Sequence, residues 1–276
     1  MIGLCVFVAA FTAAAMPQSS APVPPSQPLT ATAWSILQRA LTSKRASKRA
    51  NAAHSLRLVH DNPRAEEMLQ HALGDPNSKV RAAAARALGP MGARSSVPKL
   101  NALLNDRDPL VVLAAAHSLY LLGERDAVYD VDYQMLLGER KTAAGFVHSQ
   151  LDQLRDPKVV AMMALETGLG FVPFGGEGYE FYKRISKDDR TPVRVAAAKE
   201  LVNDRDPKID RALAQACSDR KPAVRAAAVF AIAKRDNPAL LNAIAPLLGD
   251  KNESVKYEAA AAILRLDSVR SANGKN

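Results

Sequence analysis

Small and apolar residues recur at helical spacing in a motif that returns along most of the chain. In the segment Asp75 to Gly89 (DPNSKVRAAAARALG), the stripe at i, i+3, i+4, i+7 and i+8 consists of Val80, Ala83, Ala84, Ala87 and Leu88. The pattern returns at residues 111–119, 193–201, 224–232 and 255–263, with leading valines separated by 31, 82, 31 and 31 residues. An earlier copy at 48–56 starts with lysine, and a weaker copy begins at Val159. Such periodicity predicts repeated amphipathic helices.

Polar residues mark the same repeat at fixed offsets. Aspartate stands five residues before the leading valine in five copies, and a basic residue follows the valine in four of them. Second apolar segments, at residues 97–104 and 240–248, lie between copies and predict a partner helix for each motif. We therefore expect an all-α fold, an α-α superhelix of about seven two-helix repeats, in which stacked neighbours bury each apolar stripe.

These DPxxxVRxAAAxALG-like units resemble HEAT repeats, specifically the short class called PBS-lyase HEAT-like repeats. The resemblance covers residues 43 to 268 and implies an α-α superhelix. It also implies that the recurring aspartates and arginines stack as a structural ladder between repeats rather than bind a ligand. The residues concerned are Asp75, Asp106, Asp188, Asp219 and Asp250, with Arg81, Arg194 and Arg225.

The two ends of the chain depart from the repeat. Residues 1–16 (MIGLCVFVAAFTAAAM) carry no charged side chain, which predicts a secretory signal peptide over 1–15; an uncleaved anchor and a buried first helix are the alternatives. Residues 16–32 form a Pro/Ser-rich linker, with the first helix expected after Thr30 or Thr32. The solenoid then occupies 33–268 and a flexible tail 269–276. We expect a periplasmic or secreted protein, or one held at the inner membrane by an uncleaved signal.

An irregular insertion around residues 124–185 interrupts the repeat. Within it, Gly168 to Tyr182 (GLGFVPFGGEGYEFY) contains five glycines and a proline, which predict a shaped loop. Aromatic side chains on a loop between rigid helices suit partner binding, whereas the alternative is that they fill a wider core. The candidate partner-binding residues are Phe171, Phe174, Glu177 and Tyr179.

Basic residues exceed acidic ones, giving a formal net charge of +9 and a pI near 9.6, which favours anionic partners. The excess is marked in the first repeat, where a candidate basic patch comprises Lys44, Arg45, Lys48 and Arg49. This patch could bind an anionic polymer or a membrane surface, or could be the solvated face of the terminal repeat. The predicted signal peptide argues against nucleic acid as a partner.

Catalytic patterns are missing from the sequence. The histidines at 54, 60, 71, 117 and 148 are scattered without metal-ligand spacing, and there is no G-x-S-x-G motif or cysteine pair. The HEAT-repeat di-iron hydroxylases, which resemble this architecture, rely on His-Glu pairs that do not occur here. Cys217 is expected to be a small core residue. We expect no metal or cofactor and a non-enzymatic protein–protein interaction or scaffolding module. The alternatives are an electrostatic binder acting through the basic first repeat and a bilin-lyase-like enzyme.

Overall fold

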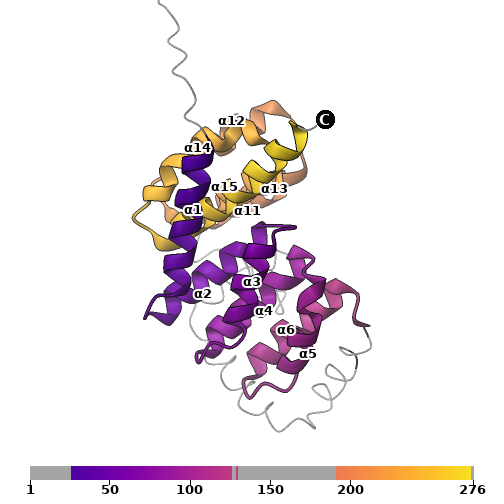
Figure 1. Cartoon of the computed structure of the whole chain (residues 1–276). Helices are drawn as coiled ribbons and strands as arrows, with labels where there is room; N and C mark the ends of the chain where they lie inside the picture. The colour runs from indigo at the N-terminus through magenta and orange to yellow at the C-terminus, as the bar shows by residue number, and fades with distance from the viewer. Residues whose placement is uncertain (1–25, 126–128, 130–190, 205, 275–276) are drawn as a thin grey trace, which may run out of the picture.

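The computed structural model describes residues 26–125, 129, 191–204 and 206–274, and within these ranges the chain consists of helices joined by turns, without a strand (Figure 1). This confirms the all-α solenoid. The predicted signal segment, the four candidate loop residues, Asp188 and most of the insertion lie outside the described residues. Five helix pairs are complete in the described ranges, and α11 adds one more helix of the repeat type.

Residues 26–125 form a first arm of helix pairs. Its elements are α1 (Ser26–Leu41), α2 (Ala46–Ser55) with the 3-10 turn η1 (Leu56–Leu58), α3 (Pro63–Ala72), α4 (Ser78–Met91), η2 (Arg94–Ser96), α5 (Val97–Leu103) and α6 (Pro109–Leu122). Asn62, Asn77 and Asp108 cap the helices that follow them, each accepting a backbone N–H through its side chain. Gly92 and Gly123 end α4 and α6 in the left-handed conformation.

Residues 191–274 form a second arm. Its elements are α11 (Thr191–Glu200), η3 (Leu201–Asn203), α12 (Pro207–Ala216), α13 (Pro222–Lys234), η4 (Pro238–Leu240), α14 (Leu241–Ile244), η5 (Ala245–Gly249) and α15 (Glu253–Asn273). The helix expected over 240–248 is regular only through Ile244. Pro246 has no N–H to donate, and the chain continues there as a 3-10 turn.

Both ends of the described solenoid are more helical than expected. Helix α1 begins at Ser26, so the start predicted after Thr30 or Thr32 is wrong, as is the placing of residues 26–32 in the linker. Pro28 is tolerated there because the first helical turn needs no N–H donor. Likewise α15 continues to Asn273, through most of the segment expected to be a flexible tail. These end helices contact each other, α1 against α15, which explains why both are ordered.

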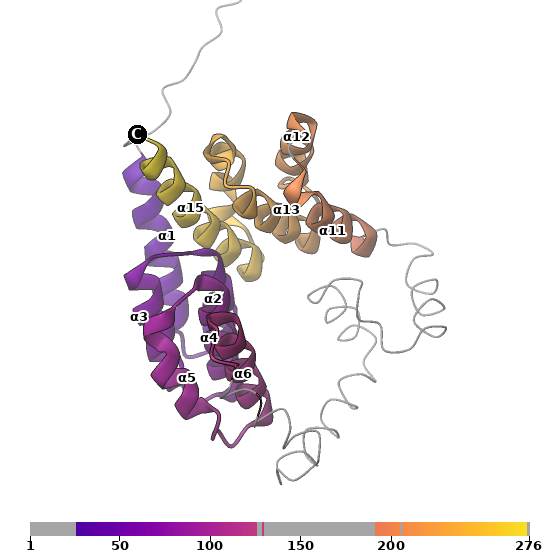
Figure 2. The same cartoon turned by 90° about the vertical axis from the view of Figure 1, so that its right-hand side faces the viewer.

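The order of the repeats in space differs from their order in the chain. The inner helices (α2, α4, α6, α11, α13 and α15) pack in the sequence α11, α13, α15, α2, α4, α6. Helix α15 therefore contacts α13 on one side and α1 and α2 on the other, joining the arms through the two ends of the described chain. Figure 2 shows the arms meeting there at a bend, with the inner helices on its inside and the outer helices (α1, α3, α5, α12 and α14) on its outside.

Alanine permits the close packing of the inner helices. Residues Ala259 to Ala262 of α15 are fully buried, as the helix has neighbours on both sides. The closest approach that requires glycine is between α4 and α6. A Cβ atom built on Gly89 would lie 2.7 Å from the Cα and Oγ atoms of Ser118. The Ser118 hydroxyl in turn donates to the Ala85 carbonyl at 2.6 Å, which fixes the approach.

Gly89→Ala is therefore expected to lower the free energy of unfolding by about 2 kcal/mol, because the added methyl group must push the two helix backbones apart. Urea denaturation measures the change. Gly249→Ala is the control, since a Cβ atom there meets nothing within 4 Å. Equal effects from the two substitutions would show that α4 and α6 do not pack this closely.

Candidate functional site

Arginine–aspartate pairs connect successive inner helices near their N-terminal ends. Arg81 donates from Nε and Nη2 to both carboxylate oxygens of Asp106 at 2.8 Å, and its Nη1 donates to the Asp75 carbonyl at 2.9 Å. Arg225 binds Asp250 at 2.7 and 2.8 Å and the Asp219 carbonyl at 2.7 Å in the same way. Each arginine thus fastens the turn of its own repeat to the turn of the next.

Arg49 belongs to this ladder, although the sequence pattern had placed it in the basic patch. It binds both carboxylate oxygens of Asp75, at 2.7 and 2.9 Å, and donates to the Ser43 carbonyl at 2.8 Å. Its guanidinium holds the pKa of Asp75 below the usual range. The sequence pattern could have identified Arg49 as a ladder residue, because it follows the leading residue of its copy, Lys48, as Arg81 follows Val80. The copy was harder to recognise because Ser43 stands where the other copies have aspartate.

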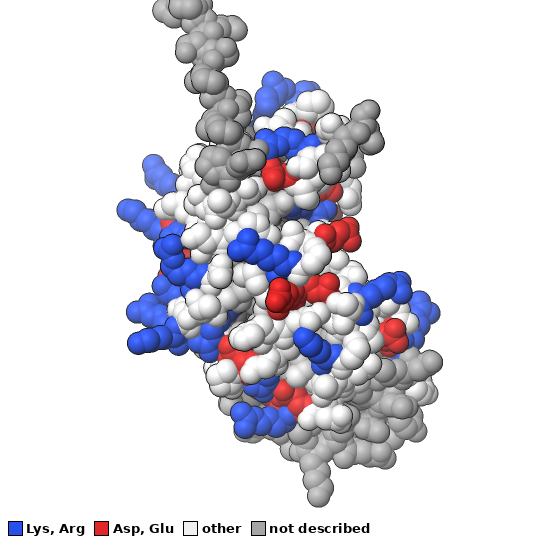
Figure 3. Space-filling model, in the orientation of Figure 1, with Lys and Arg blue, Asp and Glu red and all other residues white. Residues whose placement is uncertain are grey.

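The candidate basic patch is consequently reduced. Arg49 is committed to Asp75, and Lys48 forms an ion pair with Glu253 of α15. Lys44 and Arg45 remain exposed in the turn between α1 and α2. Figure 3 shows basic side chains gathered on this edge of the molecule, whereas the outer helices of the first arm carry both charge signs. Two of the four patch residues, Lys48 and Arg49, therefore form ion pairs within the fold, and the other two, Lys44 and Arg45, are exposed.

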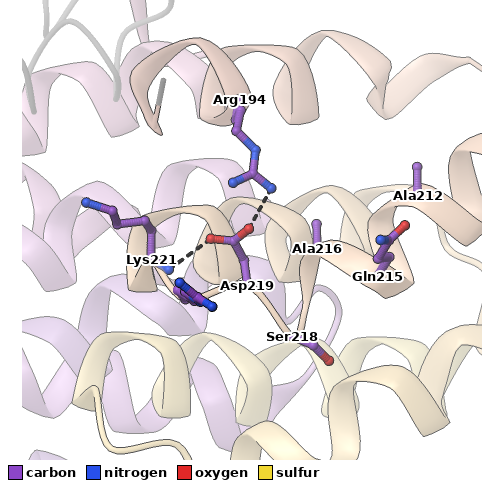
Figure 4. Close-up of a pocket in the computed structure, with 8 residues that line it drawn as sticks. Arg194, Ala212, Gln215, Ala216, Ser218, Asp219 and Lys221 are labelled. Carbon is purple, nitrogen blue, oxygen red and sulfur yellow. Dashed lines mark hydrogen bonds and ion pairs between the residues drawn. The ribbon is translucent and has the colours of Figure 1, made fainter. Parts of the chain in front are cut away.

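Arg194 forms the ladder pair between α11 and the turn that precedes α13. It contacts Asp219 at 2.5 Å with 48% of its side chain exposed, beside an open pocket of about 670 Å³ (Figure 4). Asp219 also accepts the backbone N–H of Lys221 at 2.9 Å. These contacts hold the pKa of Asp219 below its usual range, with the backbone bond the largest cause. Two of the residues that line the pocket, Arg194 and Asp219, are thus the ladder pair itself.

A second set of polar contacts holds the two arms together across α15. Arg57 donates from Nη2 and Nη1 to the Glu258 carboxylate at 2.7 and 3.2 Å, and its guanidinium lies 5.2 Å from the centre of the Phe230 ring on α13. Arg265 binds Asp236 at 2.6 and 2.8 Å and donates to the Leu58 carbonyl at 3.1 Å. No sequence prediction singled out this junction, whose partners are 201 and 207 residues apart.

One position of the repeat recurs on each of the six inner helices. The sixth residue after each leading residue gives, in spatial order from α11 to α6, the inner row Lys199, Phe230, Ala261, His54, Arg86 and His117. Arg86 and His117 are exposed, whereas Ala261 is fully buried. The row combines cationic, aromatic and imidazole side chains and includes no carboxylate.

The pKa of His54, near the centre of the inner row, depends on its burial and on the charges around it. Neighbouring groups desolvate its ring, and Arg57, Arg86 and Lys199 repel a proton from it, so that the pKa falls to about 3. These three cations come from the first arm and from α11 of the second. The inner faces of both arms therefore act on the same imidazole, which stays neutral at pH 7.

A family model described as HEAT repeats matches residues 33–120 and 180–263, more than half of the chain. The chain belongs to the HEAT-repeat family. No curated protein matches it.

Among solved structures, human deoxyhypusine hydroxylase in complex with glycerol is 17% identical, covering 88% of this chain and 98% of that one, with a TM-score of 0.33. The complex of CpcE and CpcF of phycocyanin lyase from Nostoc sp. PCC7120 is 20% identical, covering 95% and 99%, with a TM-score of 0.29. An engineered protein is 18% identical, covering 86% of this chain and 97% of that one, with a TM-score of 0.29. At such values none of these assigns a role to a residue of this HEAT-repeat chain.

Within the described HEAT repeats, no group of three or more His, Cys, Asp or Glu residues is placed to hold a metal ion. None of the described helices combines the length and the apolar character that crossing a membrane requires. Cys217 is buried with 3% exposure, as expected of a core residue, and burial raises the pKa of its thiol to about 11.

The neutral His54 makes the stability of these HEAT repeats depend on pH. An unfolded chain binds a proton at this residue near pH 6.5, whereas the folded chain does so only near pH 3, so acid favours unfolding throughout that window. Between pH 7 and pH 5 the loss from this residue is about 2 kcal/mol. Urea denaturation at pH 7 and pH 5 measures the change. The wild type is expected to lose about 2 kcal/mol more than His54→Gln between the two pH values. An unchanged pH dependence in the variant would contradict the buried neutral imidazole.

Proposed function

We propose that this protein is a non-enzymatic binding module, exported from the cytoplasm, that holds a partner protein on the inner helices of its two arms. HEAT repeats form an interaction scaffold because stacked helix pairs present an extended surface whose shape does not depend on any single loop. The observation that carries the proposal is the division of polar residues between the ladder and the inner row. Ladder charges are paired with each other, and the inner row leaves Arg86 and His117 exposed to a partner.

The proposed export rests on the uncharged apolar run over residues 1–16 and the small residues Ala13 to Ala15 that follow its apolar core. Cell fractionation of the native host, followed by N-terminal sequencing of the mature chain, tests it. A mature N-terminus near residue 16 in the periplasm or medium supports export. An intact Met1 in the cytoplasm would refute it.

Photocrosslinking in the native host tests where a partner lies. Benzoylphenylalanine would be placed at His117, exposed on inner helix α6, and in a matched variant at Arg211, exposed on outer helix α12. We expect one discrete crosslinked protein from position 117 and none from position 211. The same adduct from both positions, or from 211 alone, would show that the inner helices are not the binding surface. Turnover of a small molecule by the purified chain would overturn the non-enzymatic part.

A further inference from the structure

The turns that precede the inner helices form one continuous edge along both arms. This ladder edge comprises the first turn of each inner helix and the described turns before them, at residues 42–45, 73–77, 104–108, 217–221 and 249–252. Within each arm, the ladder pairs join one turn to the next. Across the junction, Lys48 and Glu253 pair in the first turns of α2 and α15, and Asn51 donates to Ser254 at 3.2 Å. The N-terminal ends of the inner helices, from α11 to α6, are therefore neighbours along this edge.

The carboxylates of the ladder edge are engaged within the fold. The ladder arginines bind four of them in ion pairs, and Glu253 pairs with Lys48. Asp108 accepts the Leu110 N–H as the cap of α6. The turns that define the edge contain no other aspartate or glutamate. The edge therefore presents little negative charge to solvent.

Cations on the same edge remain exposed. Six of them, from five repeats, form no ion pair with any described residue: Lys44, Arg45, Lys79, Arg107, Arg220 and Lys251. They precede or begin α13, α15, α2, α4 and α6, so both arms contribute. The opposite edge, formed by the turns that follow the inner helices, also exposes acids, namely Asp61, Glu124, Asp204, Asp206 and Asp236. Unbalanced positive charge is therefore concentrated on one edge of the solenoid.

From this separation of charge we propose that the ladder edge docks the protein on an anionic phospholipid surface, with the six cations against the lipid phosphates. Near an anionic bilayer each Lys or Arg strengthens association about fivefold, so that six cations on one edge act together. The edge is distinct from the inner helices that the proposed function assigns to a partner protein, and occupation of one does not exclude the other. It also differs from the patch predicted from the sequence, which lay in one repeat and included the paired Lys48 and Arg49.

The shape of the edge favours a planar surface over a linear polyanion. Basic side chains gather at the left of Figure 3, and Figure 2, seen from the right of Figure 1, shows the bend between the arms face-on. The ladder edge therefore lies across one face of the bend, where a flat surface can contact both arms. A linear polymer bound along the same cations would have to turn with the bend.

The residues of the edge also suit lipid phosphates better than nucleic acid. The turns that define the edge contain no aromatic side chain, whereas proteins that bind single strands stack the bases on aromatic rings. Sequence readout of duplex DNA uses a helix or a β-ribbon that enters a groove, whereas this edge consists of short turns fastened to one another. Exposed cations without such elements provide the electrostatic attraction on which docking to anionic lipids depends.

Vesicle flotation of the chain purified from its native host tests the proposal. The vesicles contain phosphatidylcholine alone, or phosphatidylcholine with about one third phosphatidylglycerol. We expect binding to the anionic vesicles only, and its loss at high ionic strength, because salt screens exposed charges. Lys79→Glu with Lys251→Glu, one change in each arm, should weaken the binding about tenfold or more.

Arg94→Glu with Lys208→Glu is the matched control for this double variant. It changes the net charge equally, again once in each arm, at exposed positions on the opposite edge, and should leave binding nearly unchanged. All variants share the same N-terminal segment, so differences between them report the ladder edge. Circular dichroism of each variant verifies the fold, which the exposed Lys79 and Lys251 do not support.

The remaining outcomes would overturn the proposal. Failure to bind the anionic vesicles, or equal binding to both kinds of vesicle, would show that charge does not dock the protein on lipid. Equal losses in the two double variants would show that net charge, rather than the ladder edge, governs binding. Tighter binding of a short DNA duplex, lost in the variant with Lys79→Glu and Lys251→Glu, would assign the edge to nucleic acid instead.

Discussion

Glu258→Ala is expected to lower the free energy of unfolding by about 3 kcal/mol, because it leaves the Arg57 guanidinium inside the junction without its carboxylate. The side chains of Arg57 and Glu258 are only 20% and 8% exposed, so water cannot replace the lost partner fully. The remaining acceptor of Arg57 is the His54 carbonyl at 2.9 Å, while Lys234 adds positive charge nearby. Urea denaturation at pH 7 measures the change.

Glu253→Ala provides the matched control for the junction. Glu253 lies on the same helix and forms an ion pair with Lys48 of α2, but its side chain is 40% exposed. A pair that keeps this much contact with water contributes less than about 1 kcal/mol. The double variant Arg57→Ala with Glu258→Ala should lose less than the sum of the single changes, since no uncompensated charge remains. Equal losses from Glu253→Ala and Glu258→Ala would show that burial does not govern the junction.

The repeat architecture could be predicted because its determinants are local. Val80, Val224 and Val255 are buried to within 2% exposure, as the 3.6-residue periodicity requires. The ladder is also local, since Arg81 and Asp106 are 25 residues apart and occupy fixed positions of successive units. Periodicity therefore specified the repeated helices and most of their buried faces, although the leading residue Val193 is 44% exposed.

The junction could not be predicted in the same way, because periodicity relates consecutive units and says nothing about which end units touch. One signal was nevertheless present. The third residue after each leading residue is alanine in four copies, at 83, 114, 196 and 227, but Asn51 and Glu258 break the pattern. These two exceptions lie on α2 and α15, which pack together: Asn51 donates to Ser254 at 3.2 Å, and Glu258 binds Arg57. A polar residue in place of the usual alanine thus marked the two helices, α2 and α15, that pack against each other rather than against a consecutive repeat.

The ladder predicts a second large effect, from Arg81→Met. Residue Arg81 is 7% exposed and makes a bidentate contact with Asp106, so its removal leaves a poorly solvated carboxylate and is expected to lower the free energy of unfolding by about 3 kcal/mol. Arg194→Met removes the equivalent arginine where its side chain is 48% exposed, and should change stability by less than about 1 kcal/mol. Urea denaturation of both variants at pH 7 shows whether the loss of stability depends on the burial of the arginine or only on its position in the ladder.

Denaturation at low pH tests the contribution of the Arg81–Asp106 pair independently. Burial would raise the pKa of Asp106, but hydrogen bonds from Arg81 and from the Asp108 N–H outweigh it and lower the folded-state pKa below that of an unfolded aspartate. The stabilisation is therefore complete above the unfolded pKa of about 4 and is lost as the pH falls through the folded value. The difference between wild type and Arg81→Met should shrink when denaturation is repeated at about pH 3. If the difference instead persists undiminished in acid, Arg81 stabilises the solenoid by packing rather than through the Asp106 carboxylate.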